Sequence, residues 1–510
     1  NKVQKENSEE AKEILIENGF EVGFSEEYER ELEYIPDELT EEMIEEAKIE
    51  GVRDIRELPL VTIDGSDTKD FDDALSIRKI GDDLWEVGVH IADVTYYVKQ
   101  GDTIDEEAFK RATSVYLVDR TIPMLPERLS NQLCSLRPHE DKCCFSVLFK
   151  MDSAANVKEY QIVHTLINSD RRFTYEEAQT VIETGEGDMK KEILMLDELA
   201  KKLREKRFVN GAIAFERTEV RFEIDDKGKP LGVYFKESKD ANKLIEEFML
   251  LANRTVAEHI GKVKLKKEKA KTFVYRVHDL PDPEKLSNLS QFISRFGYKL
   301  KTTGKQTEVS SSINRLLDQV QGKREQNLIE TIAIRSMSKA IYSTENLGHY
   351  GLAFDFYTHF TSPIRRYPDM MVHRLLDEYA TGAKSVDAVA YEDLCKHCSD
   401  REQLAANAER ASIKYKQVEF MSDKVGQVYD GVISGIQEWG IYVELAENKC
   451  EGMIPMRDLD DDYYTFDEKN YCLVGRRTHN VYRLGDEVVV RVKKTNLEKK
   501  QMDFELIEKK

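Results

Sequence analysis

Four aspartates crowd into ten residues of this chain, directly after a short apolar segment. In the sequence LPLVTIDGSDTKDFDDALSI they are Asp64, Asp70, Asp72 and Asp73, and a fifth, Asp67, lies in the turn between the first two. Residues 58–62 predict a short buried strand that ends at Asp64, and residues 65–67 predict a turn. Asp70 and Asp72 lie two residues apart, so an extended backbone points both side chains to one side. The segment therefore predicts a strand exit at which several carboxylates meet.

Carboxylates this close together raise each other's pKa or repel one another. A divalent cation removes that conflict, and oxygen ligands suit Mg²⁺ or Mn²⁺. An acidic loop in solvent is the alternative interpretation. A calcium loop of the EF-hand type is excluded, because Lys69 stands at the sixth position, where glycine is required. The cluster predicts a hydrolytic site for a phosphodiester, where metal ions activate water and neutralise the leaving oxygen.

The overall charge gives no simple indication of the binding partner. The chain has 510 residues, which predicts two or more domains, and a formal net charge of −21. Residues 1–60 hold 20 acidic and 7 basic side chains, so the remainder is close to balance. Acidity therefore does not exclude nucleic acid but predicts a confined basic path. The candidate lysines, for which a solvated basic face is the alternative, are Lys262, Lys264, Lys266, Lys267, Lys269 and Lys271.

The cysteines and the apolar segments indicate the compartment. Seven cysteines in this length, without a signal peptide or an apolar run of about 18 residues, predict a reduced cytoplasmic protein without a membrane span. Cys395 and Cys398 form a lone CxxC, which we interpret as structural thiols. His90, His278 and His373 lack ligand spacing and are expected to be structural. The chain begins at Asn1, and we expect a fragment or a processed form.

Pattern changes divide the chain into three parts. Residues 1–56 are charged and helix-prone, typical of a connector. Residues 57–424 mix strands and helices; in them, residues 213–215 and 220–224 are expected to form a strand pair, and helices to prevail from residue 243. Residues 425–510 predict a barrel of the OB type. Its expected strands are 428–433, 440–445, 451–456, 487–493 and 501–506.

Aromatic residues of the expected barrel are candidates for base stacking. These are Trp439, Tyr442, Tyr463 and Tyr464. Core packing is the alternative, and we expect it to claim at least one of them.

The segment TSPIRRYPD, residues 361–369, reads as a capped turn followed by a helix. Ser362 suits an N-cap and Pro363 the first helical position, and Pro368 predicts that a second helix starts near it. Arg365 and Arg366 would then be held stiffly, which suits bidentate phosphate binding; surface salt bridges are the alternative. Upstream, Glu246 and Asn253 lie seven residues apart on one helix face, where either could meet a sugar hydroxyl or simply face solvent.

Several long segments together resemble the ribonuclease R branch of the ribonuclease II (RNB) exoribonucleases. They are the aspartate segment, HIADVTYYV, RATSVYLVDRTIPMLPERLSNQLCSL, KLIEEFMLLAN and HFTSPIRRYPDMMVHR. The tail, from GQVYDGVISGIQEWGIYVELAENKCEGMIP to YRLGDEVVVRV, is similar to the S1-type RNA-binding barrel of those enzymes. The resemblance extends from about Glu57 to the C-terminus.

The resemblance implies processive hydrolysis of single-stranded and structured RNA from the 3′ end, releasing nucleoside 5′-monophosphates. It implies an α/β catalytic domain with a narrow RNA channel and a buried site that holds Mg²⁺, or Mn²⁺, with two ions during catalysis. By resemblance, the four aspartates are the catalytic and metal-binding set, and Arg365 is the catalytic-loop arginine. Tyr116 corresponds to an aromatic at the terminal nucleotides, Phe215 to the other stacking aromatic, and Glu246 or Glu247 to a channel acid.

As a hypothesis for the metals, Asp64 and Asp73 hold one ion, while Asp70 and Asp72 position a second ion or the attacking water. Members of the family carry cold-shock-type barrels before the catalytic domain, whereas this chain has room there only for a connector. Three alternatives stay open: an RNA-binding homologue without activity, a deoxyribonuclease, and a scaffold subunit of a degradation complex. The complete aspartate set argues against the first of these.

Overall fold

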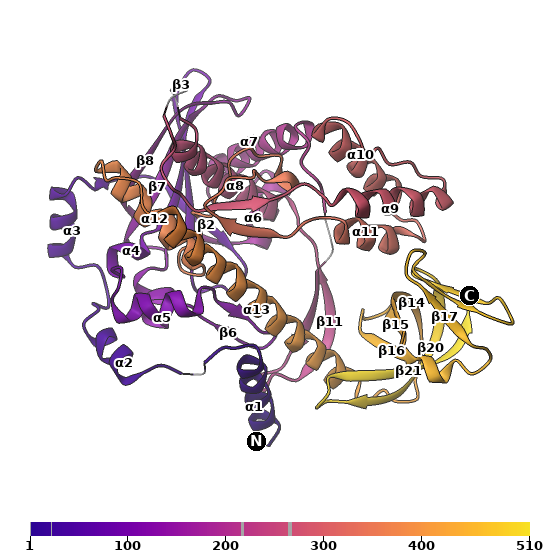
Figure 1. Ribbon diagram of the computed structural model, residues 1–510. Helices are drawn as coiled ribbons and strands as arrows, with labels where there is room; N and C mark the ends of the chain where they lie inside the picture. The colour runs from indigo at the N-terminus through magenta and orange to yellow at the C-terminus, as the bar shows by residue number, and fades with distance from the viewer. Residues whose placement is uncertain (1, 22, 216–218, 264–267) are drawn as a thin grey trace.

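The chain folds into a mixed α/β body followed by a separate β-barrel, as the pattern changes predict (Figure 1). The computed structural model describes residues 2–21, 23–215, 219–263 and 268–510. The N-terminus lies beside the body and the C-terminus on the barrel. Lys264, Lys266 and Lys267 of the expected basic path lie outside the described residues.

The body is built on a seven-stranded sheet with the strand order β1-β8-β7-β4-β3-β2-β9. Neighbouring strands are antiparallel except at two places, where β1 runs parallel to β8 and β2 runs parallel to β9. The alternation in residues 85–91 places Val87, Val89 and Ile91 of β4 in the core. The strands are β1 (Arg53–Asp54), β2 (Leu60–Asp64), β3 (Asp73–Gly81), β4 (Leu84–Ala92), β7 (Asp141–Met151), β8 (Val157–Asn168) and β9 (Arg171–Thr174).

Helices with one apolar stripe cover this sheet. In α8 (Asp240–Gly261), side chains at four-residue spacing are fully buried in the core that also contains Val87 and Val89. They are Leu244, Phe248, Ala252 and Val256. The other helices around the sheet are α4 (Val94–Tyr97), α5 (Thr103–Arg111), α6 (Tyr175–Thr184), α7 (Lys190–Val209) and α12 (Tyr367–Ala380).

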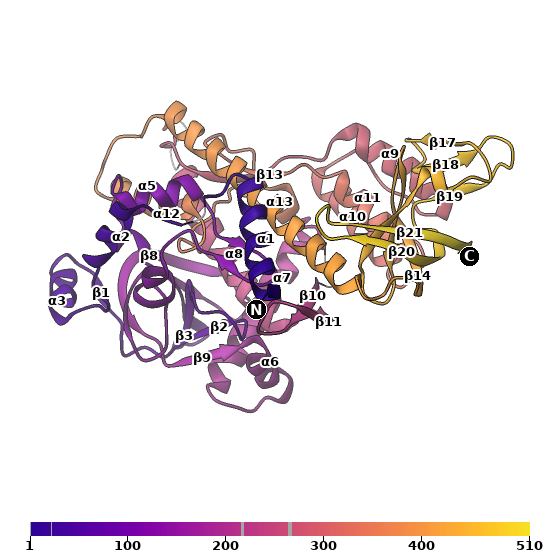
Figure 2. The same cartoon turned by 90° about the horizontal axis from the view of Figure 1, so that it is seen from below.

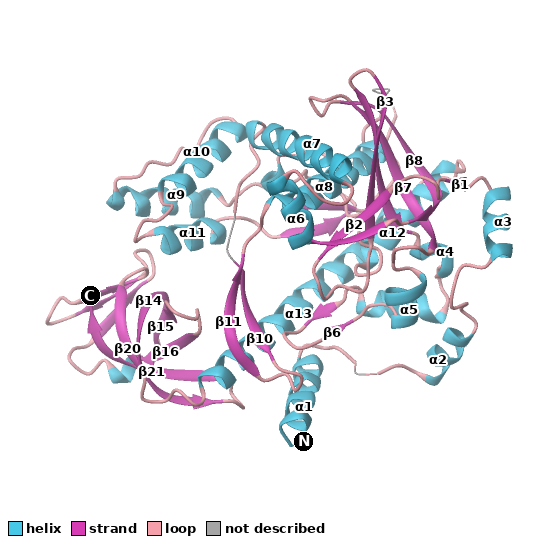
Figure 3. Ribbon diagram, turned by 180° about the vertical axis from the view of Figure 1, so that it is seen from behind, coloured by secondary structure: helices cyan, strands magenta, loops and turns pink. Residues whose placement is uncertain are grey.

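A helical region between α8 and α12 lies against the barrel (Figure 3). Its elements are β12 (Tyr275–His278), α9 (Pro283–Ile293), α10 (Gln306–Gln319), α11 (Gln326–Arg335) and β13 (Ala340–Ser343). Phe292 and Leu328 of this region share one apolar cluster with Tyr482 and Leu484 of the C-terminal segment. The barrel is therefore packed onto the body and not merely tethered to it.

The long helix α13 (Ala388–Met421) runs from the body to the barrel (Figures 1 and 2). Cys395 and Cys398 lie on its buried side as free thiols, which confirms the structural interpretation. His90 and His373 are also fully buried: His90 bonds to Ser76 and Ser146, and the His373 ring bonds to a backbone oxygen.

The C-terminal segment forms a closed barrel in the order β14-β15-β16-β21-β20. All five expected strands are confirmed. They are β14 (Val428–Gln437), β15 (Gly440–Leu445), β16 (Glu451–Pro455), β20 (Glu487–Asn496) and β21 (Gln501–Lys509). A small sheet of β17 (Tyr464–Asp467), β18 (Cys472–Gly475) and β19 (Val481–Arg483) is inserted between β16 and β20.

The first 56 residues pack against the body through three helices. These are α1 (Lys2–Glu17), α2 (Glu26–Glu33) and α3 (Glu41–Ile49). Ile14 and Leu15 of α1 share an apolar cluster with Leu117 and Ala405. The parallel bridge of β1 with β8 begins at Arg53, so the sheet starts before the expected boundary at residue 57. No helix in the described part of the chain is both long enough and apolar enough to cross a membrane.

One strand expectation is wrong. Residues 212–215 form no strand, and β10 (Glu219–Ile224) pairs instead with β11 (Pro230–Lys236). The turn that joins them is closed by hydrogen bonds from the Asp225 backbone N–H to the Lys229 carbonyl and from the Gly228 N–H to the Asp225 carbonyl. The backbone groups of β10 are therefore paired with the strand that follows it in the sequence. The turn residues Asp-Asp-Lys-Gly are the signal from which this hairpin could have been predicted.

Candidate active site

A cavity of about 550 Å³ collects most of the predicted site residues. Asp64 is the last residue of β2 and Asp73 the first of β3, and the loop between them begins with a turn closed by the Thr68 N–H and the Gly65 carbonyl (3.1 Å). The strand exit predicted from sequence is therefore present. The predicted residues on the wall are Asp64, Asp70, Asp72, Asp73, Tyr116, Glu246, Arg365 and Arg366.

Two of the aspartates each carry one buried oxygen without a hydrogen-bond donor among the described residues. Asp64 Oδ2 and Asp73 Oδ1 have no hydrogen-bond partner within the described residues. Burial raises the pKa of both carboxyls, and the negative charge of Asp73 raises that of Asp64 further. A divalent cation coordinated by these oxygens would compensate for their burial without a hydrogen-bond donor. These residues therefore fit a bound metal. In the described ranges no three His, Cys, Asp or Glu side chains form a preassembled metal-ligand group.

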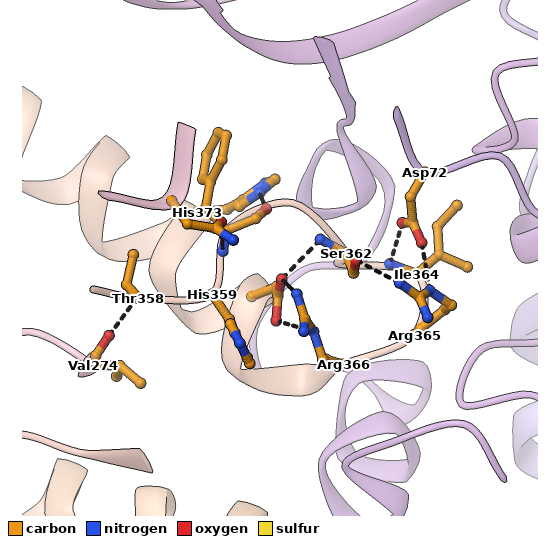
Figure 4. Close-up of polar contacts among 12 residues, drawn as sticks. Asp72, Val274, Thr358, His359, Ser362, Ile364, Arg365, Arg366 and His373 are labelled. Carbon is orange, nitrogen blue, oxygen red and sulfur yellow. Dashed lines mark hydrogen bonds and ion pairs between the residues drawn. The ribbon is translucent and has the colours of Figure 1, made fainter. Parts of the chain in front are cut away.

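Asp72 differs from its neighbours because both of its oxygens are occupied (Figure 4). Oδ1 accepts the Ile364 backbone N–H at 3.0 Å, and Oδ2 accepts Arg365 Nε at 3.1 Å. Burial raises the pKa of Asp72 to about 7, and Arg365 acts in the opposite direction. Asp72 therefore ties the segment after residue 361 to the aspartate loop, across nearly 300 residues of sequence.

The segment that carries the two arginines is a tight turn before a helix. Arg366 N–H bonds to the Ser362 carbonyl at 3.0 Å, and α12 starts at Tyr367 with Pro368 in its first turn, as the sequence predicts. The predicted N-cap at Ser362 is wrong: residues 363–365 form a turn rather than a helix, and the Ser362 hydroxyl accepts Arg365 Nη2 at 2.7 Å instead of a backbone N–H.

The two arginines have different surroundings. The Arg366 guanidinium makes two hydrogen bonds, at 3.0 and 2.9 Å, to the fully buried Asp369, which also accepts the Ser362 backbone N–H (Figure 4). The Arg365 side chain is 41% exposed and lines the cavity. Arg366 thus stiffens the turn, whereas Arg365 faces the space in which a phosphate could lie.

Tyr116 lies at the cavity wall rather than in the core. It ends the two-residue strand β5 (Val115–Tyr116), and its backbone N–H bonds to Glu409 Oε1 at 2.9 Å. The side chain is 41% exposed, and its phenol lies next to the Arg365 guanidinium. A ring in this position is available to stack on a base, which a core tyrosine is not.

Of three polar residues of α8, Glu246 and Asn253 lie on the cavity wall and Glu247 does not. Glu246 is half exposed and lies 3.9 Å from the Arg204 guanidinium. Glu247 is buried in an ion pair with Arg207 at 2.8 Å. Asn253 accepts the Phe360 backbone N–H at 2.8 Å and donates to the Tyr357 hydroxyl, so its amide supports the segment leading to the arginine turn. Of the two acids that the resemblance left open, Glu246 is the one at the cavity.

Phe215 is not on the wall of this cavity. It lines a neighbouring cavity of about 1060 Å³, which shares Glu246 with the first. The segment before it is held by Asn314, which accepts the Ala214 N–H at 3.0 Å and donates to the Ala212 carbonyl at 2.7 Å.

Sequence reasoning missed several residues of the site. Arg172, on β9, donates to the backbone carbonyls of Asp64 and Gly65 and so fixes the start of the aspartate loop. The other missed residues line the cavity and are Tyr175, Arg221, Lys236 and Tyr357. The parallel pairing of β2 with β9 brings Arg172 to Asp64 from more than 100 residues away, and no local pattern indicates such a pairing.

On the barrel, Trp439 and Tyr442 lie together at the surface. Trp439 is 57% exposed, and its Nε1 donates to the Tyr442 hydroxyl at 2.9 Å. Tyr463 is also exposed, whereas Tyr464 packs against the Tyr482 ring at 5.4 Å. Of the four aromatic candidates, Tyr464 therefore packs against the apolar core, as expected for at least one of them.

A cavity lined by four aspartates and an arginine, in a chain that ends in a barrel with surface aromatics, fits an enzyme that cleaves phosphodiesters. Residues 52–382 match the model of the RNB domain, and residues 422–507 match that of the S1 RNA binding domain. The chain therefore belongs to the RNB family, in its ribonuclease R branch.

Individual relatives match this chain over almost its whole length. Ribonuclease R of Aquifex aeolicus is 40% identical over 491 residues, which are 94% of this chain and 68% of that protein. Ribonuclease R of Thermotoga maritima is 39% identical over 93% of this chain and 69% of its own length. The structure of Mycoplasma genitalium RNase R in complex with ribose methylated single-stranded RNA superposes with a TM-score of 0.88 at 27% identity, covering 98% of this chain and 78% of that one.

Proposed function

We propose that this chain hydrolyses RNA processively from the 3′ end and releases nucleoside 5′-monophosphates. The observation that carries the proposal is the single cavity that brings four aspartates, Arg365 and Tyr116 together. Membership of the ribonuclease R branch and the S1 domain support RNA as the substrate. A 3′-end mechanism is further supported by the position of Tyr116, whose exposed ring can hold a terminal base beside the aspartates.

The hydrolytic chemistry of the family requires a divalent metal, and we propose Mg²⁺, with two ions during catalysis. Asp64 and Asp73 would hold one ion through the oxygens that have no donor among the described residues, and Asp70 lies beside them on the wall. When bound, the metal activates water and neutralises charge on the scissile phosphate.

The remaining residues have separate roles in this proposal. Arg365 donates to the phosphoryl oxygens as negative charge builds up on them. Asp72 is a positioning residue, since both of its oxygens hold the arginine turn. Tyr116 stacks on the terminal base, while Glu246 and Phe215 line the path farther back, in the larger cavity. Trp439 and Tyr442 hold upstream RNA on the barrel.

Division into a connector (1–56), a catalytic domain (57–424) and a barrel (425–510) remains our proposal for the domains, although β1 already joins the sheet at Arg53. The end of α13 at Met421 and the start of β14 at Val428 support the second boundary. We also propose a cytoplasmic location, supported by seven cysteines that are all free and buried.

The test uses single-stranded RNA labelled at either end, with matched DNA, in Mg²⁺ and in EDTA. The expected result is immediate release of labelled mononucleotide from 3′-labelled RNA only. The 5′ label should pass from full-length RNA to a short end product without a ladder of intermediates, and EDTA should stop both. Release from the 5′ label first, or equal cleavage of DNA, would refute the proposal; complete inactivity with retained RNA binding would favour a homologue without catalysis.

A further inference from the structure

A second cavity lies on another face of α8 from the aspartates. Its volume is about 570 Å³, and it is bounded by α7, α8, the start of β8 and the segment around residue 354. On α8, residues Glu246, Met249 and Asn253 face the catalytic cavity, whereas Arg254 and Glu258 face the second one. The helical repeat of 3.6 residues puts these two sets on different sides of the helix. Nothing in the proposed mechanism uses this second cavity.

The wall between the two cavities is thin and apolar. Leu250 lines both cavities. It packs with Phe354, on the second cavity, and Tyr357, on the catalytic cavity, in a small apolar cluster separate from the main core. The rings of Phe354 and Tyr357 lie 5.8 Å apart. Leu250 is therefore the residue at which the two cavities meet, and a change of its rotamer is the smallest motion that would connect them.

A processive enzyme of this kind needs a second opening. The RNA that remains to be degraded fills the entrance, while the product forms at the far, 3′ end of the strand. The product carries a phosphate monoester, with a charge of about −1.5 to −2 at neutral pH. Its way out must therefore be separate from the RNA path and must offer positive charge.

The second cavity has the chemistry for such a product. The Lys206 ammonium donates to the neutral Asn156 side-chain oxygen at 2.8 Å and is exposed at the mouth. The Arg254 guanidinium is paired with Glu258 at 3.1 Å and lies 4.9 Å from the centre of the Phe354 ring, where a base could also stack, so a phosphate would compete with Glu258 for Arg254. The volume falls in the range of small-ligand sites, roughly 300–1,000 Å³.

We propose that this cavity is the release site for the nucleoside 5′-monophosphate, which leaves the catalytic cavity past Leu250. The phosphate would meet Lys206 and Arg254, and the base would lie against Phe354 before it reaches solvent. This inference rests on the proposed function, because it needs a mononucleotide product and a strand that stays bound.

The first test blocks the opening of the second cavity with a bulky label. Asn210 lines the cavity and is exposed at the end of α7, and all seven native cysteines are buried. An Asn210→Cys variant can therefore be labelled selectively with a bulky maleimide. In rapid-quench assays, the first nucleotide should be cleaved at the parent rate and later cleavages should slow by about tenfold or more. The matched control is Thr180→Cys with the same label, at an exposed site in a cavity on the α6 side of the catalytic one; its later cleavages should keep the parent rate.

A second measurement tests the charge at the mouth. Added adenosine 5′-monophosphate should inhibit the parent enzyme by occupying the cavity, and Lys206→Glu should weaken that inhibition by about fivefold or more. Lys191→Glu makes the same charge change on the exposed side of α7 and should leave inhibition unchanged.

The outcomes separate the two proposals. Unchanged later cleavages in the fully labelled Asn210→Cys variant, slowing by the Thr180 label alone, or unchanged inhibition in Lys206→Glu would each overturn the release site. In those cases the unmodified enzyme would still release 3′-terminal mononucleotides. Failure of the proposed function would instead appear as the absence of that mononucleotide from the unmodified enzyme.

Discussion

At the scale of single residues, the four aspartates are not equivalent. Among the described residues, Asp64 and Asp73 each present one buried oxygen without a donor, whereas both oxygens of Asp72 hold the arginine turn. Our hypothesis from sequence placed Asp72 with Asp70 at a second metal or at the attacking water. In the structure, Asp72 instead makes contacts that position Arg365. Substituting Asp72 therefore tests whether this positioning matters for cleavage.

Asp72→Asn should reduce cleavage by about a hundredfold or more, because an amide has one acceptor oxygen for two donors, Arg365 Nε and the Ile364 N–H, so the turn that positions the guanidinium loosens. RNA binding should stay within a small factor, since the variant removes a negative charge from a site for a polyanion. Single-turnover rates and equilibrium binding of short RNA measure the two effects. Asp82→Asn, exposed in the β3–β4 turn, is the matched control. Near-parental turnover in a folded Asp72→Asn variant would remove Asp72 from the site.

Arg365→Lys should also lose about a hundredfold in rate, because a point charge replaces a planar fork that bonds Asp72 and Ser362 at once. Arg410→Lys, an exposed position on α13, controls for the change itself. The cleavage rate at saturating RNA decides the matter. A parental rate would mean that the Arg365 side chain is only a surface ion pair.

Tyr116→Ala should leave longer final oligonucleotides, with near-normal initial rates on long RNA. One stacked base contributes about 1–3 kcal/mol, which matters for a short strand and little for a long one held elsewhere. Tyr116→Phe keeps the ring and loses the phenol beside Arg365, so it should give parental end products. Gel analysis of the end products measures both. If the folded alanine variant stops at the parental length, the ring does not touch the terminal bases.

At the scale of elements, sequence patterns predicted what is local. The five barrel strands follow from short alternating runs between glycine turns, and the strand ending at Asp64 follows from the apolar run before it. The strand pair at residues 213–215 was wrong because a closer partner, β11, was overlooked. Arg172 and Tyr175 were missed because only the pairing of β2 with β9 brings them to the aspartates. Tyr116 and Phe215 came from family resemblance, since neither has a distinctive local pattern.

The barrel's surface aromatics give a prediction at this scale. Trp439→Ala should weaken binding of long RNA by about fivefold or more, as one stacking contact is worth roughly 1–3 kcal/mol. Cleavage of saturating short RNA should be unchanged, because the aspartate cavity is not altered. Tyr34→Ala removes a highly exposed aromatic from the end of α2 and should change neither quantity. Equal losses for both variants, or none for Trp439→Ala, would show that Trp439 does not bind RNA.

At the scale of the whole molecule, the barrel and the body form one packed unit. The apolar cluster around Phe292 and Leu328 continues into Tyr482 and Leu484, and Lys500 of the barrel lies 3.4 Å from Glu10 of α1. The Arg295 guanidinium also bonds to Asn470 of the inserted sheet. Removing residues 426–510 would expose this shared core, so loss of activity after truncation would not isolate RNA binding. Point changes on the barrel surface are the cleaner test.

The most direct measurement of the central claim is cleavage of RNA in water that carries a heavy isotope of oxygen, with Mg²⁺ present. If the aspartate cavity hydrolyses the terminal phosphodiester, mass spectrometry will find one heavy oxygen in the 5′-phosphate of each released mononucleotide. The Asp64→Asn variant should release almost none of this product while still binding RNA. Unlabelled 5′-phosphates, 3′-phosphate products, or parental release by folded Asp64→Asn would contradict the account.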